Sequence, residues 1–257
     1  MNDDWLTRYS RHILLDAVDV AGQRAISDAR VLVVGAGGLG SSVLLYLAAS
    51  GVGYITIIDG DTVSLANLQR QIVHRQTDID RNKAESAADN LRRLNPEISI
   101  TPISRYLDTA TDIDPQYQVV VDCSDNFATR YLLNRACQQH RIPLVSGAAI
   151  RFEGLLAVFD FRHDNSPCYE CLFPATPHAT EDDTCSRNGV FSPLVGMIGT
   201  AQASETLKLI MGIGQTMHSR LASLDMLSLR WHESRLIRDP ACPVCANHST
   251  TVHSATT

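Results

Sequence analysis

The stretch ARVLVVGAGGLG, residues 29–40, decides the fold. An apolar run passes directly into a G-x-G-x-x-G pattern formed by Gly35, Gly37 and Gly40, with Gly38 inside it. In such a loop the first glycine permits a tight turn, the second lets backbone approach phosphate, and the third lets helix and strand pack closely. The residues after the loop are again apolar. The stretch therefore predicts a buried strand, a phosphate-binding loop and a helix.

An acidic residue, Asp59, ends the next apolar run, YITIID at residues 54–59, and lies 19 residues after Gly40. A carboxylate at this distance from the loop is placed to bind ribose hydroxyls. Loop and acid together predict a nucleotide site, but the pattern does not distinguish a mononucleotide from a dinucleotide. The alternative is a glycine turn that serves packing alone.

Apolar strands alternate with helical segments in the first part of the chain, which predicts a Rossmann-like, doubly wound, mostly parallel α/β sheet. The expected helices are 41–53, 83–95 and 127–140, and the further strands are 98–107, 117–126 and 142–149. After residue 150 we expect antiparallel strands at 154–161 and 217–237, a polar mobile loop at 174–189 and a long helix at 191–212. These segments predict a single domain over 1–257, with a helical arm at 1–27, a nucleotide-binding half at 28–150, a second half at 151–246 and a disordered tail at 247–257.

The composition narrows the class of protein. A net charge of −6 and a pI of about 5.8 argue against a general nucleic-acid binder. No apolar run approaches the ~20 residues that span a bilayer, and the N-terminus lacks the apolar core of a secretory signal, so we expect a cytoplasmic protein without a membrane partner. Seven cysteines in such a chain indicate metal ligation or thiol chemistry rather than a disulfide framework.

A basic run follows Asp59, with Arg70, Arg75, Arg81 and Lys83 inside 24 residues. In a parallel sheet, ligands collect beyond the carboxyl ends of the strands, where this run emerges. We expect Arg75 and Arg81 to be solvated loop charges. Arg70 and Lys83 are instead suited to bind phosphates, because arginine grips oxyanions with two donors and lysine adds a compact charge.

Asp125 follows the fourth strand and should lie at the same edge of the sheet. A carboxylate beside polyphosphate is repelled unless a cation intervenes, and Mg²⁺ binds carboxylates together with phosphate oxygens. Arg70, Lys83 and Asp125 therefore predict a site for a magnesium-bound triphosphate.

Two C-x-x-C pairs, Cys168 with Cys171 and Cys242 with Cys245, are separated by 70 residues. Four thiolates in two such pairs form a closed tetrahedral Zn²⁺ site, which has no open position for catalysis. A redox pair is the alternative. The pairs favour a structural zinc ion that tethers the C-terminal region to the middle of the chain.

Several motifs closely resemble the MoeB/ThiF family, the bacterial relatives of ubiquitin-activating enzymes. They are ARVLVVGAGGLG, IIDGDTV, NLQRQ, DRNK, VVVDCSDN and the two cysteine pairs, and the resemblance runs from RYSRHILL to CPVC. It implies an adenylyltransferase that binds MgATP and the C-terminal Gly-Gly tail of a small ubiquitin-like sulfur-carrier protein. The tail carboxylate would attack the α-phosphate and release pyrophosphate, for sulfur transfer in molybdopterin or thiamin biosynthesis. The half at 151–246 would bind the carrier.

The resemblance also implies roles for individual residues. It places Gly38 on the phosphate loop and Asp59 on the ribose. It assigns phosphate contacts to Asn67, Arg70 and Lys83, and sites near the metal and nucleotide to Asp125 and Asn126, with Asp61 and Gln69 as further nucleotide contacts. Arg11 resembles an arginine that reaches the ATP of the neighbouring subunit in a homodimer.

Cys185 lies in a polar segment beside Arg187, which favours a thiolate. It aligns with a cysteine that links covalently to the carrier in the thiamin branch, and we take it as a candidate nucleophile; the alternative is an incidental exposed cysteine. The N-terminal sequence and Cys185 lean slightly toward the thiamin branch. Two other functions stay open, an NAD-dependent oxidoreductase and a non-catalytic scaffold for a ubiquitin-like partner.

Overall fold

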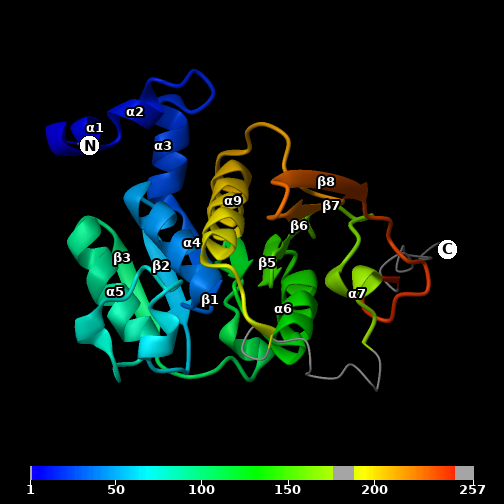
Figure 1. Cartoon of the computed structure of the whole chain (residues 1–257). Coiled ribbons are helices and arrows are strands. Elements are labelled where there is room, and N and C mark those ends of the chain that lie inside the picture. Colours follow the sequence, from blue (N-terminus) through cyan, green and yellow to red (C-terminus); the bar gives the residue numbers. More distant parts are fainter. Residues whose placement is uncertain (1, 176–187, 247–257) are drawn as a thin grey trace.

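The computed structural model describes residues 2–175 and 188–246, which form an eight-stranded sheet with helices on both faces (Figure 1). The strand order is β3-β2-β1-β4-β5-β6-β7-β8. Neighbouring strands are parallel from β3 to β5 and antiparallel from β5 to β8. The predicted change from a parallel to an antiparallel sheet after residue 150 is confirmed.

The elements agree with the expected segments to within a few residues. The strands are β1 (Arg30–Val34), β2 (Tyr54–Ile58), β3 (Ser99–Ile103), β4 (Val119–Asp122), β5 (Leu144–Ile150), β6 (Glu153–Phe159), β7 (Arg220–Asp225) and β8 (Arg230–Arg235). The helices are α1 (Asp3–Arg8), α2 (Ser10–Ile13), α3 (Asp19–Asp28), α4 (Gly38–Ala49), α5 (Lys83–Leu94), α6 (Phe127–His140), α7 (Tyr169–Leu172) and α9 (Ser192–Met211). Short 3₁₀ turns are η1 (Leu65–Asn67), η2 (Gln76–Asp78) and η3 (Ala110–Asp112).

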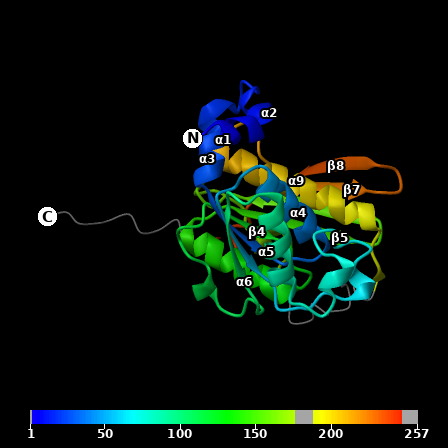
Figure 2. The same ribbon diagram turned by 90° about the vertical axis from the view of Figure 1, so that its left-hand side faces the viewer.

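Strand β1 is buried on both faces and joins the two hydrophobic cores. Its side chains alternate, so that Val31 and Val33 belong to the core beneath α4, α5 and α9, while Leu32 and Val34 belong to the core beneath α6. Figure 2 shows α9 and α6 on opposite faces of the sheet. The near-continuous apolar sequence of β1 follows from this double burial.

The N-terminal arm and the nucleotide loops lie at opposite ends of the strands. Helix α3 ends immediately before the amino end of β1, whereas the glycine loop and the segment 60–82 follow the carboxyl ends of β1 and β2. In Figure 1, α1 and α2 accordingly project away from the cyan segment that follows β2. Within the described residues, no helix is both long and apolar enough to span a bilayer. Most of the predicted mobile loop and the whole predicted tail lie outside the described residues.

Candidate functional site

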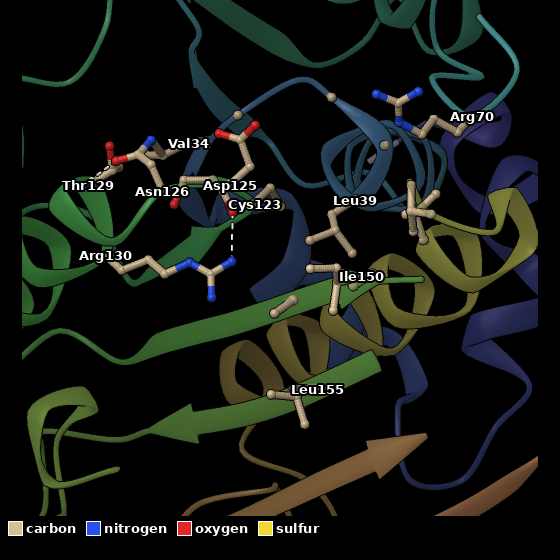
Figure 3. Close-up of a pocket in the computed structure, with 18 of the residues that line it drawn as sticks. Val34, Leu39, Arg70, Cys123, Asp125, Asn126, Thr129, Arg130, Ile150 and Leu155 are labelled. Carbon is tan, nitrogen blue, oxygen red and sulfur yellow. Dashed lines mark hydrogen bonds between the residues drawn. The ribbon is translucent and has the colours of Figure 1, made fainter. Parts of the chain in front are cut away.

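A cavity of about 710 Å³ lies at the carboxyl ends of the parallel strands (Figure 3). Its polar lining includes most of the predicted nucleotide-site residues, namely Gly35, Gly37, Gly38, Asp59, Asp61, Arg70, Lys83, Asp125 and Asn126. Its other wall is apolar and is formed by side chains such as Leu39, Ile150 and Leu155. The parallel topology thus brings residues from five separate sequence motifs to one site.

The glycine loop is closed by backbone contacts that only glycine allows. Gly35 has a φ of +99°, and a Cβ there would lie 2.6 Å from the carbonyl oxygen of Cys123. A Cβ on Gly40 would lie 2.0 Å from the carbonyl oxygen of Gly35. Gly40 does not line the cavity, so its role in this structure is the close packing of loop and helix. Helix α4 begins at Gly38, and its first N–H groups provide an anion site.

Asp59 braces the glycine loop as well as facing the cavity. One carboxylate oxygen accepts from the Ala36 N–H at 2.7 Å and the other from the Asp61 N–H at 2.8 Å. Each oxygen retains a second lone pair for a ribose hydroxyl. Burial raises the pKa of Asp59, and the nearby Lys83 ammonium and the two backbone donors oppose that rise.

Lys83 is the first residue of α5, and its side chain is buried at the cavity wall. The helix begins here because the Asn82 side chain accepts from the N–H groups of Ala84 and Glu85, at 2.8 and 3.2 Å. The Lys83 ammonium pairs with the Asp61 carboxylate at 2.7 Å. A lysine buried to this extent requires such a partner, because an isolated charge in the interior is costly.

Arg70 lines the cavity opposite Asp125 and is oriented by its own loop (Figure 3). Its guanidinium donates to the Asn67 side-chain oxygen at 3.1 Å and to the Ala66 carbonyl at 3.3 Å. Asn67 does not itself line the cavity, so in this structure it acts on Arg70. Gln69 is exposed and also lies outside the lining, whereas Gln71 is buried within it. The predicted phosphate contact of Asn67 and nucleotide contact of Gln69 remain predictions.

The segment after β4 contributes both charge signs to the cavity. Asp125 and Asn126 are exposed, and Asn126 caps α6 by accepting from the Thr129 N–H at 2.9 Å. Arg130, in the first turn of α6, was not predicted as a site residue. Its guanidinium donates to the carbonyl of Ser124 at 2.9 Å and to that of Gly147 at 3.3 Å (Figure 3). Its place one helical turn after Asn126 is the sequence signal that could have indicated it.

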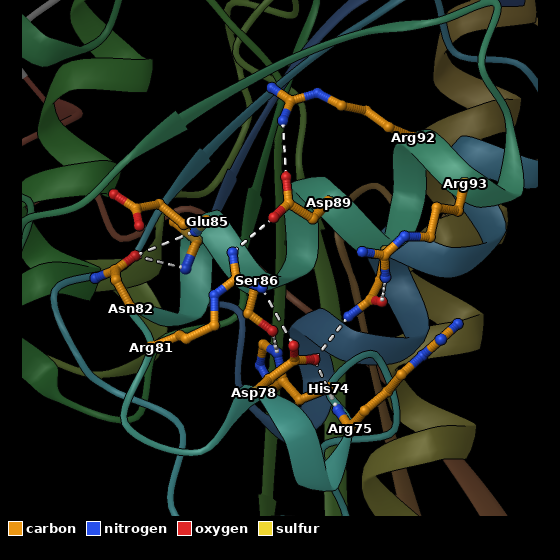
Figure 4. Close-up of polar contacts among 12 residues, drawn as sticks. His74, Arg75, Asp78, Arg81, Asn82, Glu85, Ser86, Asp89, Arg92 and Arg93 are labelled. Carbon is orange, nitrogen blue, oxygen red and sulfur yellow. Dashed lines mark hydrogen bonds and ion pairs between the residues drawn. The ribbon is translucent and has the colours of Figure 1, made fainter.

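The remaining members of the basic run differ in role from Arg70 and Lys83. Arg81, expected to be a solvated loop charge, has a side chain that is 38% exposed, and it also pairs with Asp78 at 3.2 Å and with Asp89 at 2.6 Å (Figure 4). Arg75 is exposed, as expected. The Arg81 pairs tie the segment 60–82 to α5, because Asp89 lies on that helix.

Arg11, a predicted catalytic residue, does not line the cavity of its own chain. Arg11 is exposed on α2, in the arm at the amino end of the strands. This position keeps it from the cavity of its own chain and leaves it accessible to a second subunit. Cys185 lies outside the described residues.

The four predicted metal ligands form a compact cluster. The sulfurs of Cys168, Cys171, Cys242 and Cys245 all lie within 4.8 Å of one another, and three pairs are 3.4, 3.5 and 3.9 Å apart. Tetrahedral zinc with Zn–S bonds of about 2.3 Å requires sulfurs about 3.8 Å apart, so the four side chains fit this ion. Backbone N–H groups of Cys168 and Asp239 approach the Cys171 sulfur at 3.5 and 3.4 Å and would stabilise a thiolate there.

The fold, the glycine loop and the cysteine cluster define an α/β protein with a candidate nucleotide site and a candidate metal site. The chain belongs to the ThiF family, whose match covers residues 9–244.

Related proteins span nearly the whole chain. The molybdopterin-synthase adenylyltransferase of Salmonella typhimurium is 44% identical over 95% of this chain and 98% of its own length. The SAMP-activating enzyme E1 of Haloferax volcanii is 43% identical over 93% of this chain and 88% of its own. Among solved structures, Escherichia coli MccB with MccA-N7isoASN superposes with a TM-score of 0.82 at 25% identity, over 94% of this chain and 75% of that one.

Proposed function

We propose that this protein is an adenylyltransferase that activates the C-terminal carboxylate of a small ubiquitin-like sulfur-carrier protein for molybdopterin biosynthesis. The observation that carries the proposal is the convergence of Arg70, Lys83, Asp59 and Asp125 with the glycine loop on one cavity. A nicotinamide dinucleotide would require the loop and Asp59 but not the two cations. Two relatives, from Salmonella typhimurium and Escherichia coli, are named molybdopterin-synthase adenylyltransferase. Their names favour the molybdopterin branch, whereas the N-terminal sequence leans slightly toward thiamin.

In the proposed reaction, a carboxylate oxygen of the carrier attacks the α-phosphorus of ATP. The new bond is carboxylate oxygen to α-phosphorus, and the bond from α-phosphorus to the bridging oxygen breaks, so that pyrophosphate leaves with the electron pair. Both reactants are anionic and repel one another. Arg70, Lys83 and the N-terminal N–H groups of α4 offset this repulsion by placing positive charge at the phosphates.

Two ions complete the proposal. Asp125 offers a hard oxygen donor beside the phosphate-binding cations and would hold Mg²⁺, which neutralises phosphate charge when bound. The four cysteines would hold a structural Zn²⁺ without taking part in the reaction. The apolar wall of the cavity, with Leu39, Ile150 and Leu155, suits the extended Gly-Gly tail, because glycines can pass closely between apolar side chains.

A second subunit would supply Arg11 to the nucleotide. The exposed place of Arg11 at the far end of its own strands supports a homodimer in which the two arms are exchanged between neighbouring sites. The Arg11→Ala protein would then lose activity on its own. Mixing it with a Lys83→Ala protein would restore part of the activity, because half of the sites in a mixed dimer are intact.

The direct test is carrier-dependent ATP–pyrophosphate exchange, measured with candidate molybdopterin and thiamin carriers in turn. We expect exchange with a carrier that ends in Gly-Gly and none when the tail is removed. Absence of exchange with every carrier, with nicotinamide cofactor bound instead, would reject the proposed function.

A further inference from the structure

Tyr106 is tied to the buried Lys83 through a single carboxylate. The Tyr106 hydroxyl donates to Oδ1 of Asp61, and the Lys83 ammonium pairs with Oδ2 of the same residue at 2.7 Å. The three side chains come from different elements: Tyr106 follows β3, Asp61 follows β2 and Lys83 begins α5. All three line the candidate nucleotide cavity. Neither the motifs nor the resemblance assigns a role to Tyr106.

The ring of Tyr106 is held in place although 65% of the residue is exposed. It lies on Gly60, where a Cβ would be 2.7 Å from the ring carbon Cδ2 and 2.8 Å from the Tyr106 nitrogen. Such distances are too short for any side chain at position 60. The ring is thus in contact with the glycine on one side, and its hydroxyl is bonded to Asp61.

The protonation states of Tyr106, Asp61 and Lys83 favour the hydrogen bonds that join them. The bond to Asp61 raises the pKa of Tyr106 to about 12, so the hydroxyl remains a donor at neutral pH. Burial raises the pKa of Asp61, but the hydrogen bonds from Lys83 and Tyr106 lower it overall, which keeps the carboxylate ionised. With one N–H directed at Asp61, the Lys83 ammonium retains two others for phosphate oxygens.

Asp61 has more room to move than Lys83, because its side chain is 50% exposed whereas that of Lys83 is 7% exposed. Without the tyrosine hydroxyl, the carboxylate can rotate into solvent and leave the ammonium without its anchor. A displacement of about 1 Å in a charge that stabilises a transition state lowers the rate by up to about a hundredfold.

We propose that Tyr106 is a positioning residue that fixes the Asp61 carboxylate and, through it, the Lys83 ammonium at the phosphate end of the cavity. The proposal rests on the proposed function, in which Lys83 acts on the phosphates of ATP. It differs from a contact between the ring and the nucleobase, which would depend on the aromatic face and not on the hydroxyl.

The test compares Tyr106→Phe, which removes the hydroxyl alone, with Tyr106→Leu, which removes the ring as well. Carrier-dependent ATP–pyrophosphate exchange gives kcat and the KM for ATP, and a separate titration gives the affinity for AMP, which lacks the β- and γ-phosphates. We expect kcat to fall about tenfold in both variants. The AMP affinity and the thermal midpoint should stay near the wild-type values, because the residue is exposed. Tyr54→Phe, at the amino end of β2, is the matched control and should behave as wild type.

A second variant tests the position of the Tyr106 ring through its contact with Gly60. Gly60→Ala should displace the ring from its seat and reproduce the fall in kcat. Wild-type exchange in Tyr106→Phe would overturn the inference alone, while the proposed function stands. A normal Tyr106→Phe together with weakened AMP binding in Tyr106→Leu would also overturn it, and would assign the ring to the nucleobase. If the wild-type protein exchanges with no carrier, the proposed function fails and the inference fails with it.

Discussion

The candidate nucleotide cavity and the cysteine cluster are both suited to bind a charged ligand, but they differ in the groups that they offer. The cavity mixes cations, carboxylates and apolar side chains, and Arg70 and Lys83 are held there by single side-chain partners that leave donors free. The cluster brings four identical ligand atoms within 4.8 Å, and three of its four cysteines are buried. The difference is the one we expect between a site that would exchange its ligand and a site that would retain one ion.

The two regions are joined by α7. Cys168 and Cys171 flank Tyr169, which lines the cavity and whose hydroxyl lies 3.5 Å from the Arg130 guanidinium. Part of the cavity wall is therefore formed by a residue that lies between two cysteines of the cluster. This connection predicts that damage to the cluster reaches the cavity, while damage to the cavity leaves the cluster intact.

The largest effect is expected from loss of the cluster. Purified protein should hold about one zinc per chain, and Cys242→Ala should lose it, because three thiolates no longer close a tetrahedral site. We expect a loss of several kcal/mol of stability, since structural zinc binding is coupled to folding. Elemental analysis and thermal unfolding measure both. Cys137→Ala, which removes a buried thiol that is not one of the four clustered cysteines, should keep its zinc. A wild-type protein that folds without zinc contradicts the assignment.

The next effect is expected in the cavity and should leave the metal in place. Lys83→Ala, Arg70→Ala and Asp125→Ala should each lower adenylate formation by two or more orders of magnitude, the loss seen when an electrostatic stabiliser of a transition state is removed. Pyrophosphate exchange and zinc content, measured on the same preparations, separate activity from folding. Arg75→Ala, an exposed arginine of the same basic run, is the matched control. Near-wild-type exchange in the first three variants would remove these residues from the site.

The cavity could be predicted from the sequence where its residues lie in local motifs. The glycine loop needs only β1 and α4 to be adjacent in the chain, and Asp59 follows from its distance to that loop. Tyr106 could not be predicted in this way, because its approach to the cavity depends on how β3 packs beside β2.

Irregular backbone limits prediction in the segment after β2. This segment has no helical or strand period that would show which side chains face inward. The sequence could not show that Gln71 is buried in the cavity wall while Gln69 is exposed. It also could not show that Arg81 pairs with Asp89, because that contact depends on the docking of the segment on α5. The cysteine pairs were predictable as ligands, but their meeting required the C-terminal segment to reach α7.

A smaller effect is expected for Asp78, which supports the cavity without lining it. This buried carboxylate accepts from the Arg75 N–H, the Asn90 amide and Arg81, at 2.9, 2.9 and 3.2 Å (Figure 4). Asp78→Ala removes the acceptor that these three donors share and should lower the free energy of unfolding by about 1–3 kcal/mol. Urea denaturation measures this loss. Asp108→Ala, which removes an exposed partner of Arg105, should change stability little. Equal losses in the two variants would contradict a supporting role for Asp78.

The smallest effect is the dependence of stability on pH through His74, which contacts the glycine loop at Ala36. The buried His74 ring donates from Nε2 to the Ala36 carbonyl at 2.9 Å, and its Nδ1 lies 2.8 Å from the Ser86 hydroxyl, which can donate to the neutral ring or accept from the protonated one. Burial lowers the pKa of His74 from its ordinary value of 6.5, and the Lys83 charge lowers it further. The unfolded chain therefore binds the proton more readily than the native protein does. The stability that His74 contributes is fully present above pH 6.5 and is lost as the pH falls toward the lower native pKa.

The test compares wild type with His74→Gln by urea denaturation at about pH 7.5 and about pH 5.5. The stability gap between the two proteins should narrow at the lower pH, because only wild type carries the histidine whose protonation favours the unfolded chain. His232→Gln, on the exposed strand β8, should show the same small gap at both values. A difference in stability between wild type and His74→Gln that is the same at both pH values would contradict this prediction. It would mean that protonation of His74 does not affect folding and that the ring supports Ala36 by packing alone.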